Sequence, residues 1–233
     1  MVDAAPSDSP ATSGDVLSRV VMPAVVLVGT AAVTVWLSAQ VETTWVEYGG
    51  YLSGVACVWL TMRNRVSSWP VGLVNCVFLF AVFWRARLFA DMWLQAVYFA
   101  LGVIGWWMWV RYRGQRVERP TQHARPRTVL VVAAAVLVGW AVMYWYFSRF
   151  TSAASPLWDS LLTSGSLGAQ YLLMRRLVEN WGFWVSVDVA YVVLFWSRHL
   201  HITSVLYVVF LVMSLNGWRD WIRQASPVPV PAP

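Results

Sequence analysis

Charged residues are scarce in this chain, and lysine is missing altogether. Only 12% of the 233 residues are charged, all 17 basic residues are arginine, and 59% of the residues are hydrophobic. A soluble domain carries roughly 25% charged residues, so a surface in water would expose a large apolar area, at a free-energy cost that grows with that area. The composition therefore excludes an ordinary soluble fold and predicts an integral membrane protein.

Cysteine is almost absent as well, and no ligand spacing typical of a metal site occurs. Cys57 and Cys76 both fall in apolar stretches, which indicates small buried side chains rather than a disulfide. The chain has no phosphate-binding glycine loop, no nucleotide fingerprint and no nucleophile motif. We therefore expect no metal site, no cofactor and no ATP-driven cycle carried out by this chain alone.

Apolar runs close to the length of a membrane span, about 20 residues, occur eight times. The predicted helices cover residues 16–38, 46–62, 69–84, 91–110, 128–147, 157–174, 181–196 and 202–221. The polar residues 1–15 and the proline-rich residues 224–233 are expected to be disordered tails. The predicted fold class is therefore all-α integral membrane, with eight transmembrane helices.

Arginine is distributed unevenly between the two sides that eight spans would define. Thirteen arginines fall on the side of both termini and four on the other side. Because cytoplasmic loops carry an excess of positive charge, we predict that both termini are cytoplasmic. The arginine-rich stretch at 111–127 is explained by this bias and by attraction to anionic lipid, and we expect no nucleic-acid partner.

The chain also matches itself at one fixed offset, the spacing that separates Trp69 from Trp181. The matching positions are Trp69 and Trp181, Trp84 and Trp196, Gly105-Trp106 and Gly217-Trp218, and Trp109 and Trp221. This repeat predicts two three-helix units of the same orientation at 45–111 and 157–223, joined by a basic loop and a linking helix at 112–148, with residues 16–40 as an extra helix. In transporters built from such repeats the solute site lies near the midplane between them.

Polar side chains within the predicted spans are candidates for a solute site, because such groups are costly in a membrane and usually functional. Asp188 is the strongest candidate, since a carboxylate there must face a cavity, pair with a donor or be protonated. It could accept from a solute hydroxyl, take part in proton coupling, or bond to a neighbouring helix. For the amides Asn75, Gln95 and Asn216, solute contact and interhelical hydrogen bonding are equally open.

Aromatic residues lie near these polar groups in sequence or helical phase. The candidates are Trp69, Tyr98, Trp181, Trp184 and Tyr191. Flat aromatic faces suit a planar solute, above all a cationic ring. Trp184 precedes Asp188 by one helical turn, so both side chains are expected on one face, whereas most of the 17 tryptophans are expected in interfacial belts.

Two segments of the chain resemble the PnuC family of vitamin transporters. The motifs that carry the resemblance are WP-x-G-x-x-N from Trp69, the Leu94-Gln95 pair, WDS from Trp158 and EN-W-x-x-W from Glu179. The resemblance covers nearly everything except the first helix and the tails. It implies a 3+1+3 helix core similar to the sugar-transporting SWEET fold, a bacterial inner membrane and a homotrimer.

The same resemblance implies uptake of nicotinamide riboside, a form of vitamin B3 used in NAD biosynthesis, by facilitated diffusion with trapping by a separate kinase. Thiamine or riboflavin is the alternative cargo. By motif, Asn75, Gln95 and Trp184 match expected substrate positions, whereas Asp188 stands where the family often has asparagine. That departure leaves the cargo open.

Two functions from other classes are weighed against a carrier. An intramembrane enzyme could use Asp188 with Asp159, but Asp159 does not lie well within a span, and an enzyme usually needs a second group close by. A substrate-capture subunit would need a surface that couples to a separate ATPase, which nothing in the sequence specifies. A uniporter is therefore the preferred prediction.

Overall fold

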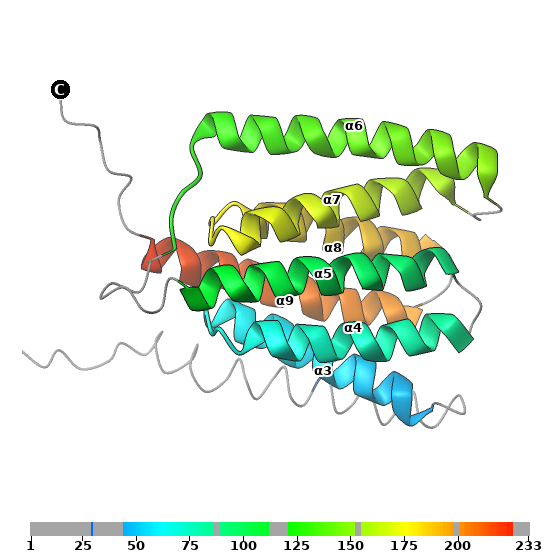
Figure 1. Cartoon of the computed structure of the whole chain (residues 1–233), viewed down its shortest axis with the longest axis horizontal. Coiled ribbons are helices and arrows are strands. Elements are labelled where there is room, and N and C mark those ends of the chain that lie inside the picture. The colour runs from blue at the N-terminus through cyan, green and yellow to red at the C-terminus, as the bar shows by residue number, and fades with distance from the viewer. Residues whose placement is uncertain are drawn as a thin grey trace, which may run out of the picture. The chain divides into compact units, whose positions relative to one another are not determined.

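The computed structural model describes residues 29, 44–85, 89–111, 121–151, 155–197 and 201–225. Within these ranges the chain forms the helices α3 (Trp45–Met62), α4 (Ser68–Arg85), α5 (Phe89–Arg111), α6 (Pro126–Phe150), α7 (Pro156–Met174), α8 (Asn180–Ser197) and α9 (His201–Gln224) (Figure 1). Seven of the eight predicted helices are thus confirmed as helices, and their ends lie at or close to the predicted places. The first predicted helix, at 16–38, lies outside the described residues apart from Gly29.

Three of the described helices are long and apolar enough to cross a membrane by length and composition: Ser68–Arg85, Met92–Arg111 and Pro126–Phe150. The other described helices do not meet this measure, and some of them carry buried polar side chains. In α7, for example, Ser160, Ser164 and Ser166 are buried inside the bundle, so these hydroxyls face other helices instead of lipid. The all-α class is confirmed, and the count of eight spans stays a prediction.

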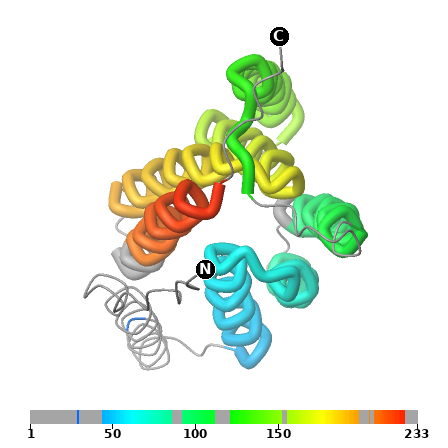
Figure 2. The backbone as a smooth tube through the Cα atoms, turned by 90° about the vertical axis from the view of Figure 1, so that its left-hand side faces the viewer, coloured from blue at the N-terminus to red at the C-terminus, as the bar shows by residue number. Residues whose placement is uncertain are grey.

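Neighbouring helices in the chain pack side by side in two groups. α3 packs on α4 and α4 on α5, while α6 packs on α7, α7 on α8 and α8 on α9. The groups meet where α3 contacts α9 and where α5 contacts α7, as the end-on view shows (Figure 2). A site between the groups is therefore bounded by helices from both halves of the chain.

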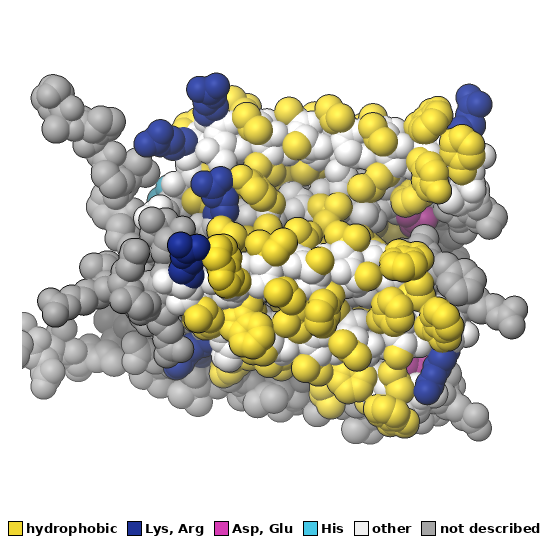
Figure 3. Space-filling view, viewed as in Figure 1, with side chains coloured by type: hydrophobic (Ala, Val, Ile, Leu, Met, Phe, Trp, Pro, Cys, Tyr) yellow, Lys and Arg dark blue, Asp and Glu magenta, His cyan; other side chains and the backbone are white. Residues whose placement is uncertain are grey.

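The outer surface of the helices is apolar along most of its length. On α6, for example, Leu130 is 70% exposed and Val138 is 64% exposed. Figure 3 shows apolar side chains spread over this face of the molecule, with basic side chains gathered towards the helix ends. An apolar band between two polar rims is what a bilayer requires.

The turn between α3 and α4 has the same backbone geometry as the turn between α7 and α8, at the equivalent place in the repeat. Asn64 and Arg176 both adopt left-handed conformations, with φ of 52° and 56°. The next residue closes each turn. Arg65 N–H donates to the carbonyl of Leu60 at 3.0 Å, and Leu177 N–H donates to the carbonyl of Leu172 at 3.0 Å. In both turns this bond returns to the last turn of the preceding helix, which is the Schellman arrangement.

Tryptophan packing on glycine also occurs twice at the repeat spacing. Trp69 of α4 lies against Gly105 of α5, and Trp181 of α8 lies against Gly217 of α9. A Cβ at Gly217 would lie 2.5 Å from the Trp181 ring, and a Cβ at Gly105 would overlap the Trp69 ring. Each indole therefore takes the space that only glycine leaves on the facing helix.

Two further tryptophans connect the halves reciprocally. Trp109 Nε1 donates to the carbonyl of Met174 at 3.1 Å, and Trp221 Nε1 donates to the carbonyl of Met62 at 3.2 Å. The ring centroids of Trp109 and Trp221 are 6.3 Å apart. Each half thus caps a helix end of the other half with an indole N–H.

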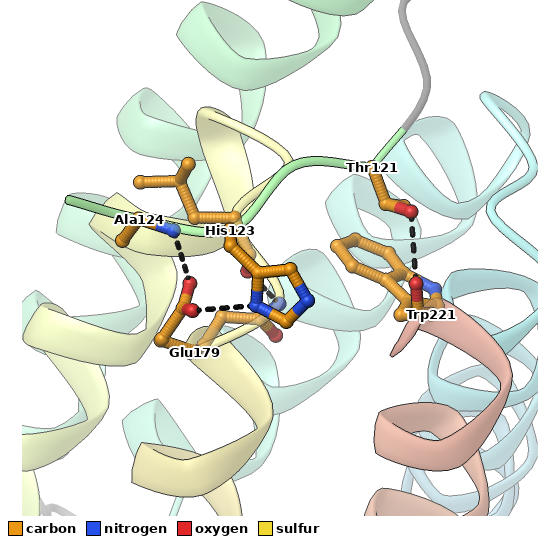
Figure 4. Close-up of polar contacts among 7 residues, drawn as sticks. Thr121, His123, Ala124, Glu179 and Trp221 are labelled. Atoms are coloured by element: carbon orange, nitrogen blue, oxygen red, sulfur yellow. Dashed lines mark hydrogen bonds and ion pairs between the residues drawn. The ribbon is translucent and has the colours of Figure 1, made fainter. Parts of the chain in front are cut away.

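The stretch of chain before α6 is tied to the turn between α7 and α8 (Figure 4). Glu179 accepts a hydrogen bond from Ala124 N–H at 2.7 Å, and its other carboxylate oxygen lies 3.0 Å from Nδ1 of His123. Thr121 Oγ1 donates to the main-chain carbonyl of Trp221 at 3.0 Å. These bonds hold the approach to α6 beside the ends of α7 and α9.

Candidate solute-binding site

A buried carboxylate joins α8 to α9 inside the bundle. Asp188 is only 5% exposed, and its Oδ2 accepts a hydrogen bond from Ser214 Oγ at 2.8 Å. Within the described part of the chain Ser214 is the hydrogen-bond donor to this carboxylate, although a carboxylate can accept about four hydrogen bonds. Oδ1 is therefore available to a donor from a solute.

Aromatic rings form a group beside this carboxylate on the same two helices. The ring centroids of Tyr191 and Tyr207 are 4.3 Å apart at an interplanar angle of 32°. Phe195 lies 5.5 Å from Tyr191 and 5.3 Å from Tyr207. The Tyr207 hydroxyl is also within electrostatic range of Asp188. This pairing places flat, electron-rich faces next to an acceptor of hydrogen bonds.

The first three-helix group contributes a tyrosine to the same region. Tyr98 of α5 makes a hydrogen bond with Ser166 of α7, and its hydroxyl is within electrostatic range of Tyr207. The polar cluster, defined as Tyr98, Ser166, Asp188, Tyr191, Tyr207 and Ser214, therefore draws on α5 as well as on α7, α8 and α9. Because the cluster includes side chains from both groups of helices, a relative movement of the groups would change the distances between its members.

Three of the predicted site residues belong to the polar cluster: Tyr98, Asp188 and Tyr191. Trp184 lies one turn before Asp188 on α8 and is half-buried. Gln95, one turn before Tyr98 on α5, is buried. It lines a cavity of about 240 Å³ between α4 and α5.

The amides Asn75 and Asn216 are bonded within the protein. Asn75 Nδ2 donates to the carbonyl of Gly50 at 2.5 Å and to Ser53 Oγ at 3.1 Å, both on α3. Asn216 Nδ2 donates to the carbonyl of Val212 at 2.6 Å, within its own helix. Of the two interpretations open from sequence, the structure shows the interhelical bond for Asn75.

The structure places Trp69 and Trp181 in the indole packing described above and not in the polar cluster. Their ring centroids lie 5.4 Å from Trp109 and 5.6 Å from Trp221 respectively. Both rings are almost fully buried, with exposures of 5% and 1%. In this conformation neither ring face is open to a solute.

Sequence reasoning missed three members of the polar cluster: Ser166, Tyr207 and Ser214. A serine in an apolar helix is a weak signal, because its hydroxyl can bond to its own helix backbone. Tyr207 has a stronger sequence signal, since it occupies the position that matches Gln95 in the repeat register. Aligning the two halves would have placed it at an equivalent position on the third helix.

The cluster is suited to binding and not to acid–base catalysis. Asp188 is the one buried carboxyl group among the described residues, whereas acid–base chemistry of the paired kind needs a second titratable group in reach. The available interactions are acceptance of hydrogen bonds, donation by hydroxyls and contact with aromatic faces. These suit a planar solute that carries hydroxyl groups.

Comparison with known proteins gives a consistent result. A family model described as nicotinamide mononucleotide transporter matches residues 44–223. The nicotinamide riboside transporter PnuC of Escherichia coli (strain K12) is 26% identical over 209 residues, which cover 79% of this chain and 87% of that protein. The riboflavin/roseoflavin transporter RibM of Streptomyces davaonensis is 27% identical over 213 residues, covering 85% and 99%.

The fold is similar to that of a solved transporter. The crystal structure of the vitamin B3 transporter PnuC matches this chain with a TM-score of 0.71 at 22% identity, covering 88% of this chain and 92% of that one. Residues 44–223, which the family model matches, include all seven of the described helices almost completely. The apolar helices agree with a multi-pass protein of the inner membrane. The chain therefore belongs to the nicotinamide mononucleotide transporter family, the PnuC transporters, and is not an enzyme.

Proposed function

We propose that this protein carries nicotinamide riboside into the cell by facilitated diffusion. The observation that carries the proposal is the buried Asp188 carboxylate beside the paired rings of Tyr191 and Tyr207. Nicotinamide riboside has a cationic pyridinium ring and ribose hydroxyls. Aromatic faces attract a cationic ring, and a carboxylate accepts strong hydrogen bonds from hydroxyl donors.

Riboflavin or thiamine is the second candidate solute. The 27% identity to RibM over nearly the whole of that protein supports riboflavin. Riboflavin is a neutral ring system, so the charge of Asp188 contributes less to its binding than to that of a pyridinium or thiazolium cation. A binding screen of the three vitamins on the purified protein separates these candidates directly.

We propose uniport because the chain has no nucleotide-binding motif and because the resemblance to the PnuC family implies facilitated diffusion. Transport then follows the solute gradient. A separate kinase that phosphorylates the solute in the cytoplasm would keep its free concentration low and so maintain inward flux. The carrier needs no coupling ion in this scheme.

The proposed architecture is a 3+1+3 parallel repeat similar to SWEET transporters. It comprises an extra helix at 16–40, units at 45–111 and 157–223, and a basic loop with a linking helix at 112–148. The reciprocal bonds of Trp109 and Trp221 and the matching turns support this division. Relative movement of the two units would open the polar cluster to one side at a time.

The proposed topology has both termini in the cytoplasm, and the proposed assembly is a trimer. With Cys57 and Cys76 replaced by alanine, a single cysteine at Phe150 should react with an impermeant thiol reagent on intact cells. A single cysteine at Arg127, at the other end of α6, should react only after the membrane is opened. The reverse pattern would place the termini outside. Light scattering of the purified protein gives the oligomeric state.

The uniport proposal is tested in vesicles that contain only this protein. Labelled nicotinamide riboside should equilibrate across the vesicle membrane without ATP and without an ion gradient. A strict requirement for a proton or sodium gradient would overturn uniport. Preferential equilibration of riboflavin or thiamine would assign the cargo to the second candidates.

A further inference from the structure

A groove between α6 and α7 lies apart from the polar cluster. Its volume is about 650 Å³, and it is lined by side chains from the two helices and from the approach to α6. None of the six members of the polar cluster is among them. The groove is therefore separate from the candidate solute site.

The groove runs beside a line of close contact between α6 and α7. Ser164 Oγ donates to the carbonyl of Val136 at 2.7 Å, and a Cβ at Gly168 would lie 2.5 Å from Val136 Cγ2. The two helices thus touch along a narrow line. Gly139 belongs to this line of contact, because a Cβ there would lie 2.8 Å from Ser164 Oγ, whereas the small side chain of Ala135 lines the space beside it.

One end of the groove is strongly basic. Arg125, Arg127 and Arg175 line it, all three are exposed, and the lining includes no acidic residue. Arg175 is oriented by the Tyr171 hydroxyl, which accepts from its Nη1 at 2.7 Å. Since a guanidinium carries five N–H donors, the three side chains keep most of their donors for a ligand.

The remainder of the groove is apolar and runs along α6. From Thr128 to Met143 its lining follows the helix for about 22 Å at 1.5 Å per residue. That length is more than half of the roughly 30 Å hydrocarbon core of a bilayer. The groove therefore has room for one acyl chain of a single leaflet, with its headgroup at the arginines.

We propose that this groove binds one acidic phospholipid, with its phosphate at Arg125, Arg127 and Arg175 and an acyl chain along Ala135 and Gly139. Basic pockets between membrane helices on the cytoplasmic side suit anionic headgroups. A second copy of this chain fits less well, because the groove would need a complementary acid. Asp159, the acid of α7, lies at the opposite end of that helix from Arg175.

Native mass spectrometry of the detergent-purified full chain, with added phosphatidylglycerol or phosphatidylcholine, tests whether the groove prefers a lipid with an acidic headgroup. We expect phosphatidylglycerol to bind more tightly by a factor on the order of a hundred, because the choline cation of phosphatidylcholine offsets its phosphate charge and would be repelled by the three arginines. Replacing all three (R125Q, R127Q and R175Q) should remove this preference. The control Arg149→Gln, at the far end of α6, should retain it. Equal binding of the two lipids to the unchanged protein would overturn the proposal.

A second pair of variants tests the apolar part. Ala135→Trp should block the groove and weaken phosphatidylglycerol binding at least tenfold, whereas Ala134→Trp, on the same exposed helix but outside the lining, should leave it unchanged. If glycerol 3-phosphate, which has no acyl chain, binds as tightly as phosphatidylglycerol, the apolar part of the groove does not bind an acyl chain. A change of oligomeric state in Ala135→Trp with unchanged lipid binding would assign the groove to a protein interface and overturn the proposal.

Discussion

Ser214 of α9 donates a hydrogen bond to Asp188 of α8 at 2.8 Å, in a part of the bundle where both side chains are buried. A hydrogen bond within a protein contributes about 0.5–1.5 kcal/mol net, and more where one partner is ionised. The bond therefore stabilises the α8–α9 contact and at the same time orients the carboxylate. Asp188 could therefore act in folding, in solute binding or in both, and variants are needed that separate these two roles.

Replacing Asp188 should affect solute binding more than folding. We expect Asp188→Ala to weaken nicotinamide riboside binding at least tenfold, about 1.4 kcal/mol, because the acceptor is lost. Asp188→Asn should be intermediate, since it keeps an acceptor oxygen and loses the charge. Calorimetric binding and the melting temperature of each variant measure the two effects. A fall in melting temperature with unchanged affinity would make the residue structural, and Ser214→Ala shows the cost of losing this bond alone.

The ring pair of Tyr191 and Tyr207 should contribute to affinity through its aromatic faces. Tyr207→Leu is expected to weaken nicotinamide riboside binding roughly tenfold, because stacking and cation–π contacts are worth about 1–2 kcal/mol. Tyr207→Phe keeps the face and should have a smaller effect. Tyr144→Leu, on the exposed surface of α6, is the matched control. Equal losses for leucine and phenylalanine at 207 would point to the hydroxyl instead.

Glycine at 217 should be required by packing. Gly217→Ala is expected to lower the free energy of unfolding by about 1–3 kcal/mol, the usual cost of overpacking, because its Cβ would lie 2.5 Å from the Trp181 ring. Gly182→Ala is the control, since its Cβ would lie at an ordinary 3.5 Å from Trp218. That variant should be neutral or slightly stabilising. Thermal unfolding compares the two, and equal melting temperatures would contradict the packing argument.

Glu179 should hold the approach to α6 in place. Glu179→Ala removes the acceptor of the Ala124 N–H, so hydrogen exchange in the peptide containing Ala124 should accelerate roughly tenfold or more, as loss of a charge-assisted bond predicts. Asp220→Asn, which changes an acid of α9, serves as control. Unchanged exchange after loss of Glu179 would mean that the other bonds, such as Val178 N–H to Gln122 O at 3.0 Å, suffice.

The sequence predicted the helices well because their signals are local. Apolar runs of span length end at arginines or begin at proline, as α6 and α7 do at Pro126 and Pro156. The family motifs are local too, and a family model matches residues 44–223. Trp109 and Trp221, which match each other at the repeat spacing, each donate an indole N–H to a carbonyl at a helix end of the other half.

The site could be predicted only in part. Asp188, Tyr98 and Tyr191 come together as a polar cluster, but Trp69 and Trp181 pack against glycines at a helix end. A tryptophan in an apolar run has the same sequence signature whether it meets a solute, a lipid or a facing helix. The partner is a property of the neighbouring helix, which the run itself does not contain.

The sequence by itself thus determined the membrane class, the helix boundaries and the family, because these depend on local hydrophobicity and motifs. Only the tertiary structure decided which polar groups lie together in the polar cluster. Asn75 and Asp188 are offset by a single position from the repeat register, and one position turns a side chain by about 100° around a helix. Asn75 consequently bonds to α3, whereas Asp188 faces α9 within the polar cluster.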